Sequence, residues 1–184
     1  MAIPINIEDL LNKRKIESNR IEFKKGWNPD KIYRTICAFA NDFDNIGGGY
    51  IVVGIEEEER TGIAKRPVTG VPIEALNDIQ KDMVGYNNKI EPYYMPRIDV
   101  QEVDGKSVLV IWAPAGVNRP YNVRERVTAK QSPSKWYIRS GTSTIEAKGE
   151  VLDELREMAN RTPFDERGNE RIEISDISPA LVLD

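Results

Sequence analysis

Four acidic residues and one lysine stand where two expected strands could bring them together. Glu17 and Glu22 bracket the start of a short alternating segment, and Glu56 and Glu57 follow a long apolar run. Mg²⁺ and Mn²⁺ prefer oxygen ligands, and a bound metal activates water for phosphodiester cleavage. One interpretation is therefore a metal-dependent nuclease site with the ligands Glu17, Glu22 and Glu56. Lys24 would contact the scissile phosphate.

A plainer interpretation is open for the same residues, and spacing alone favours it. Glu22 and Lys24 would then form a solvated strand face, and residues 56–59 an exposed acidic turn. The nearby glycines, residues 47–49, could let the backbone approach a phosphate. They precede a strand, however, and no Gly-Lys-Ser/Thr follows, so a P-loop for ATP is unsupported.

The basic residues are concentrated in two segments, although the net charge of the chain is -4. Residues 12–35 carry eight Lys and Arg against three Asp and Glu, and residues 119–139 carry six against one. A local basic surface can bind phosphate whatever the charge of the whole protein. The candidates for nucleic-acid contact are Lys24, Lys25, Arg119, Arg124, Arg126, Lys130, Lys135 and Arg139.

Aromatic residues alternate with cations in the second basic segment. Tyr121, Trp136 and Tyr137 could stack on unpaired bases while the neighbouring cations hold the backbone. On strands, however, alternation would direct half of these aromatics into the core. The sequence leaves open both a nucleic-acid groove and an ordinary surface.

The residue types that the chain lacks exclude several kinds of chemistry. There is no histidine, which excludes Ser-His and Cys-His catalysis and histidine-containing zinc sites. The single cysteine, Cys37, has apolar neighbours typical of an unreactive core thiol. No apolar segment approaches about 18 residues and the N-terminus lacks the layout of a secretory signal, so we expect a cytoplasmic protein without a membrane span.

Hydrophobic periodicity predicts both helices and strands. We expect helices over 7–15, 29–45, 73–87 and 147–160, and strands over 20–24, 50–55, 96–103, 107–113, 121–128 and 136–139. Segment 50–55 is apolar throughout, as in a strand buried on both faces. Hairpins mixed with crossover helices indicate an α+β fold with a mixed β-sheet and helices packed mainly on one face.

Residues 1–162 are expected to form one domain of ordinary size. Residues 163–184 form an acidic tail whose apolar residues are too scattered to build a core. We interpret this tail as the start of a connection to a C-terminal domain outside this sequence.

Several motifs, taken in order, resemble the Schlafen-type DNA-binding domain, also called the divergent AAA or Alba-like domain. They are ESNRIEFK at 17–24, AFAN at 38–41 and GGGYIVVGI at 47–55. RPY at 119–121 and WYIRSGTS at 136–143 fit the later part of the family pattern. The combination is specific, and it covers roughly residues 10–160.

The resemblance implies a bacterial or archaeal transcriptional regulator. It also implies a second activity, because the same domain in eukaryotic relatives is a metal-dependent ribonuclease with three acidic residues. By motif these correspond to Glu17, Glu22, and either Glu56 or Glu57, where the family usually has Asp. The family is sometimes labelled ATP-binding, but this chain lacks the P-loop lysine.

Three hypotheses about function follow. The first is a nucleic-acid-binding domain of a transcriptional regulator, with DNA or RNA as the partner. The second is a metal-dependent nuclease, and the third is a protein-interaction module that assembles a homo-oligomer.

Overall fold

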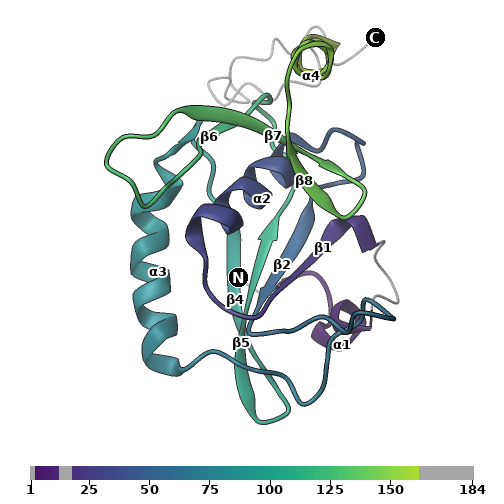
Figure 1. The fold of residues 1–184 in the computed structure, drawn as a ribbon, viewed down its shortest axis with the longest axis vertical. Helices are drawn as coiled ribbons and strands as arrows, with labels where there is room; N and C mark the ends of the chain where they lie inside the picture. The colour runs from purple at the N-terminus through teal and green to yellow at the C-terminus, as the bar shows by residue number, and fades with distance from the viewer. Residues whose placement is uncertain (1–2, 13–17, 162–184) are drawn as a thin grey trace, which may run out of the picture.

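A computed structural model of the protein describes residues 3–12 and 18–161. The helices are α1 (Ile7–Leu11), the 3-10 turn η1 (Ser18–Arg20), α2 (Pro29–Asn41), α3 (Ile73–Asn87) and α4 (Glu150–Arg161). The strands are β1 (Ile21–Lys24), β2 (Gly49–Val53), β3 (Ile90–Glu91), β4 (Arg97–Val103), β5 (Lys106–Ala113), β6 (Asn122–Arg124), β7 (Ser134–Ser140) and β8 (Ser143–Glu146). Figure 1 shows helices and strands interspersed along the chain. The α+β class predicted from the sequence is confirmed.

The first sheet has the order β1-β2-β5-β4 and is mixed, as expected. β1 and β2 are parallel, with Ile21 opposite Tyr50, whereas β5 is antiparallel to both β2 and β4. Every residue of β2 is buried, so the apolar run forms an inner strand covered on both faces. Asp104 and Gly105 adopt positive φ angles at the β4–β5 turn, as a tight hairpin requires.

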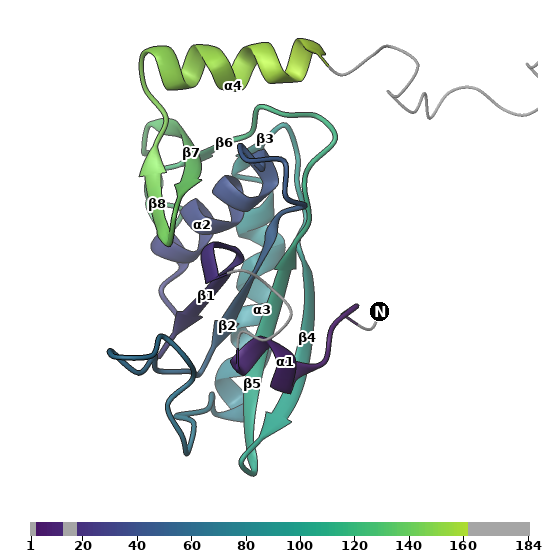
Figure 2. The same ribbon diagram turned by 90° about the vertical axis from the view of Figure 1, so that its right-hand side faces the viewer.

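The remaining strands form a second, antiparallel sheet with the order β3-β6-β7-β8. The sequence predicted neither β3 nor β8, because β3 has only two residues and β8 is a short, partly exposed edge strand. β6 is shorter than expected, since the chain leaves the sheet after Arg124 and returns at Ser134. Figure 2 shows the β7–β8 hairpin and α4 at the end of the molecule opposite the β4–β5 turn.

Helix α2 packs against both sheets. Asn28 caps its N-terminus by accepting a hydrogen bond from the Lys31 amide, and Pro29 occupies the first turn. One core cluster joins its apolar residues to Ile51 and Ile111 of the first sheet and to Val123 of the second. The helix ends at Asn41 rather than near Asn45, because Asp42 takes the left-handed conformation with φ of 42°.

The other helices complete the layers. α3 lies on the same face of the first sheet as α2, through Leu76, Ile79 and Met83, so the expectation of helices mainly on one face is confirmed. Leu10 and Leu11 of α1 cover the opposite face. Among the helices within residues 3–12 and 18–161, none has the length and apolar character needed to cross a membrane.

The buried amide of Asn41 ties α2 to the second sheet. Its nitrogen donates to the carbonyl oxygens of Tyr121, at 2.9 Å, and Tyr137, at 2.8 Å. Its oxygen accepts from the Tyr121 amide at 2.6 Å. The side chain is completely buried, so it makes all three hydrogen bonds to backbone groups away from solvent.

We expect Asn41→Ala to lower the free energy of unfolding by about 2–4 kcal/mol, because it removes three hydrogen bonds to backbone groups in the core. Urea denaturation followed by circular dichroism measures this loss. Asn88→Ala is the matched control, since the Asn88 amide makes an exposed hydrogen bond to Val84. Equal effects of the two substitutions would contradict the structural role of Asn41.

Cys37 lies in the core, as its neighbours predicted, and burial raises the pKa of its thiol to about 12. Because only the thiolate reacts, we expect no labelling by a thiol reagent at about pH 8 in the native protein and rapid labelling in denaturant. A time course of absorbance with a chromogenic disulfide reagent tests this. Rapid labelling under native conditions would show that the core opens at Cys37.

Candidate nucleic-acid interface

An open polar groove of about 350 Å³ lies where three parts of the chain meet. β1 supplies one side, the first half of α2 another, and the β7–β8 turn the third. The lining residues are Glu22, Lys24, Lys31, Arg34, Thr35, Thr142, Ser143 and Thr144. Three cations, one carboxylate and four hydroxyl groups therefore face the same space.

The alternation of β1 explains why two charged side chains face the groove. Ile21 and Phe23 are buried in the core on the α1 side of the sheet, so Glu22 and Lys24 project from the other face. The Lys24 ammonium donates to Oε1 of Glu22 at 2.6 Å. Both residues remain accessible, since the side chain of Glu22 is 20% exposed and that of Lys24 is 25% exposed. Their contact therefore lies at the groove surface.

Behind Glu22 lies the guanidinium of Arg139, whose side chain is only 7% exposed. Its Nη1 donates to Oε2 of Glu22 at 3.0 Å and to Oγ1 of Thr144 at 2.8 Å. Nε donates to the Asn19 carbonyl and Nη2 to that of Thr142. The cation also lies over the Phe39 ring, 5.1 Å from its centre. Arg139 thus supports the groove from within and joins the β7–β8 hairpin to β1 and α2.

Two cations of the groove, Lys31 and Arg34, belong to α2, and neither lies in a sequence motif named above. Lys31 is exposed, and Arg34 is half-buried. Nε of Arg34 donates to the Glu125 carbonyl at 3.0 Å, and no described residue accepts from its two terminal nitrogens. The one sequence signal that could have pointed to Lys31 and Arg34 is the basic excess of residues 12–35, which includes both.

The acidic residues proposed as metal ligands do not come together in the described part of the chain. Glu17 lies outside the described residues. Glu56 is exposed, and its carboxylate contacts Lys25 at 3.1 Å and Lys65 at 3.9 Å. The hydrogen bond from Lys25, reinforced by both positive charges, holds the pKa of Glu56 below its usual value.

Both oxygens of Glu22 also hold cations, as described above. Among residues 3–12 and 18–161, no three acidic or cysteine side chains are grouped so that they could hold a metal ion. The described residues by themselves therefore do not form a metal site. The metal hypothesis remains a prediction that depends on Glu17.

Several of the predicted basic residues have structural partners. Arg119 caps the end of α2 by donating to the carbonyls of Asn41 and Asp42. Lys135 forms ion pairs with Glu125 at 2.7 Å and Glu146 at 3.2 Å. The other members of the set are Lys24 beside Glu22, Lys25 beside Glu56, Arg124 bound to the Lys130 carbonyl, the buried Arg139, and the exposed Arg126 and Lys130.

The aromatic residues of the second basic segment do not face the groove. Tyr121 and Tyr137 are buried in the core. Trp136 is half-buried in a cluster with Leu155, and Arg156 lies over its ring. Trp136 and Tyr137 point to opposite faces of β7, and α4 covers one face while α2 covers the other. These rings therefore do not form a stacking surface for bases.

The glycine loop before β2 binds the carboxylate of Asp42 through its backbone amides. Oδ1 of Asp42 accepts from the amides of Ile46, Gly47 and Gly48, each at 3.0 Å. Arg20 holds the same loop from the other side by donating to the carbonyls of Gly47 and Gly48. These amides are therefore occupied, which agrees with a structural role for the three glycines.

Comparison with known proteins places the chain in a family. A model of the Schlafen, AlbA_2 family matches residues 17–148, which include all three elements that line the groove. The chain belongs to this family. No curated protein matches the chain.

Two solved structures resemble this AlbA_2 domain. The N-terminal domain of a RecG-related protein from Nitrosomonas europaea is 26% identical, with a TM-score of 0.46, over 69% of this chain and 78% of that one. The DIP2311 protein from Corynebacterium diphtheriae is 20% identical, with a TM-score of 0.51, over 88% of this chain and 31% of that one. The second likeness concerns the fold alone, and this chain spans about a third of that protein.

We expect Arg139→Ala to lower the free energy of unfolding by about 2–4 kcal/mol, because it leaves Glu22 and two carbonyl groups without a buried partner. Arg139→Lys should restore little of this, since an ammonium cannot reach the same set of acceptors. Urea denaturation compares both variants with Lys81→Ala on the exposed face of α3. An Arg139→Ala variant as stable as this control would contradict the supporting role.

Proposed function

We propose that this domain binds nucleic acid by its phosphate backbone in the groove between β1, α2 and the β7–β8 turn. The observation that carries the proposal is the convergence of Lys24, Lys31 and Arg34 on one open polar space. Phosphate groups are the common ligands of such clusters, because ammonium groups act as point charges and guanidinium groups donate in pairs. The family membership supports the same function.

The balance of charge in the groove favours an anionic partner. Three cations face the space directly, and Glu22 is the one carboxylate among the lining residues. Arg139 lies directly behind Glu22 and offsets its charge. The exposed hydroxyl groups of Thr142 and Ser143 can donate to phosphate oxygens as well. A phosphodiester would therefore replace water at a surface that already carries the opposite charge.

As part of a longer protein, such a domain would hold the chain on DNA, which is the role of a transcriptional regulator. A nuclease is the second candidate, because Glu22 lies in the same groove as Lys24, where a bound phosphate would meet a carboxylate. Assembly as a homo-oligomer is a third. Size-exclusion chromatography with and without residues 163–184 would test that one.

We expect Lys31→Ala and Arg34→Ala each to weaken binding and to reduce the slope of log Kd against log salt by about one, because each removes one phosphate contact. Fluorescence anisotropy with labelled DNA and RNA measures both quantities. Lys81→Ala on α3 is the control and should bind like the unchanged protein, since Lys81 is exposed and pairs only with Asp78 among the described residues. Affinity that hardly depends on salt would contradict the proposal.

We expect Glu22→Gln to bind nucleic acid at least as tightly as the unchanged protein, because the substitution removes the negative charge of the groove and keeps an acceptor oxygen for Arg139. The same samples are scored for cleavage with Mn²⁺ or a chelator. Metal-dependent cleavage that is lost in Glu22→Gln would favour the nuclease. Weaker binding by this variant would show that Glu22 positions Lys24 for the ligand.

A further inference from the structure

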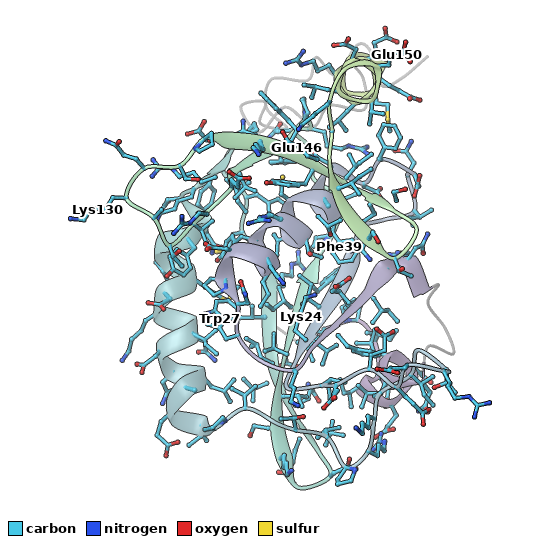
Figure 3. All side chains as sticks on the ribbon, in the orientation of Figure 1. Lys24, Trp27, Phe39, Lys130, Glu146 and Glu150 are labelled. Atoms are coloured by element: carbon cyan, nitrogen blue, oxygen red, sulfur yellow. The ribbon has the colours of Figure 1, made fainter. Side chains whose placement is uncertain are left out.

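We infer that the loop between β6 and β7, residues 125–133, is a second phosphate contact of the same interface and that the partner is the backbone of a double helix. This inference rests on the proposed function of the groove. It adds a second place of contact and the form of nucleic acid that fits both places. Figure 3 shows Lys130 at the outer end of this loop, and Lys24 at the end of β1.

The loop is attached to the part of α2 that lines the groove. The Thr128 amide donates to Oδ1 of Asp30 at 3.0 Å, and the Thr128 hydroxyl contacts the same carboxylate. One turn further along the helix, Nε of Arg34 donates to the Glu125 carbonyl at 3.0 Å. Arg34 therefore contacts the loop with one nitrogen and lines the groove. The two surfaces adjoin along α2.

Internal contacts hold the loop in one shape. The Arg126 amide donates to the Ser132 hydroxyl at 2.9 Å, and the Glu125 amide donates to the Pro133 carbonyl at 2.8 Å. Val127 is completely buried, and the Lys89 ammonium binds its carbonyl. A loop fixed in this way loses little conformational entropy when its side chains bind a ligand.

The two outward cations of the loop are the ones suited to a ligand. Arg126 and Lys130 are exposed, and neither side chain has an ion-pair partner among the described residues. Lys135, in contrast, is shared between two carboxylates, and Arg124 donates to the Lys130 carbonyl. The structure thus separates the second basic segment into residues that hold the fold and two cations that face solvent.

The composition of both surfaces favours a double helix over a single strand. Proteins that bind single strands combine cations with aromatic rings on which unpaired bases stack. No aromatic residue is present among the groove-lining residues, and none occurs in residues 125–133. Cations and hydroxyl groups suit the phosphates of a duplex, whose bases remain stacked on one another. Two adjoining cationic surfaces would contact phosphates at two places along such a backbone.

The test compares a loop variant, Arg126→Ala with Lys130→Ala, with the unchanged protein and with Lys81→Ala. The probes are labelled DNA and RNA duplexes of about two helical turns and their separate strands. Fluorescence anisotropy is recorded between about 50 and 200 mM salt. Circular dichroism confirms that the loop variant folds, as expected from the exposure of both side chains.

We expect the loop variant to bind duplexes roughly tenfold more weakly, with a salt slope reduced by about two, and the unchanged protein to prefer duplexes over single strands. The DNA and RNA arms identify which backbone it takes. Loop-variant affinity equal to that of Lys81→Ala would overturn the second contact while leaving the groove intact. If the unchanged protein bound single strands as tightly as duplexes or more tightly, the inference of a double-helical partner would be overturned. If it bound none of the probes, the proposed function would be overturned as well.

Discussion

The buried guanidinium of Arg139 is the contact on which the groove depends. It comes from the second sheet, yet it binds Glu22 of the first sheet and the carbonyl of Asn19 just before β1. It also fixes the hydroxyl of Thr144 on the hairpin that forms the third wall. Because one planar cation satisfies all these acceptors at once, the spacing of the walls is set by its dimensions.

Helix α2 holds the parts of the chain that Arg139 connects in fixed positions. Its buried face joins the two sheets through apolar packing and through the amide of Asn41, and its polar face carries Lys31 and Arg34 into the groove. The helix at the centre of the core is therefore also the helix that presents the cations proposed to bind phosphate. A site built on a packed helix and strand is more precisely positioned than one built on loops alone.

Part of this site follows from the sequence and part does not. Alternation in β1 was enough to predict that Glu22 and Lys24 share a face, because Ile21 and Phe23 must enter the core. Lys31 and Arg34 could not be distinguished from other cations on a polar helix face, since nothing local tells which strand lies opposite. Arg139 was expected to contact nucleic acid, yet it is buried. Its contacts with Asn19 and Glu22 join residues more than a hundred positions apart, which local sequence patterns do not reveal.

The glycine loop before β2 bears on which part of this fold is available to bind phosphate. Three successive amides converge on one carboxylate oxygen of Asp42, which is the arrangement of backbone nests that bind phosphate in other proteins. Here the anion is covalently part of the chain, so it occupies the nest at a high effective concentration, and a free phosphate would have to displace the Asp42 carboxylate. The loop is thus an anion site filled by the protein's own carboxylate, and the phosphate contacts proposed for this domain come from side chains instead.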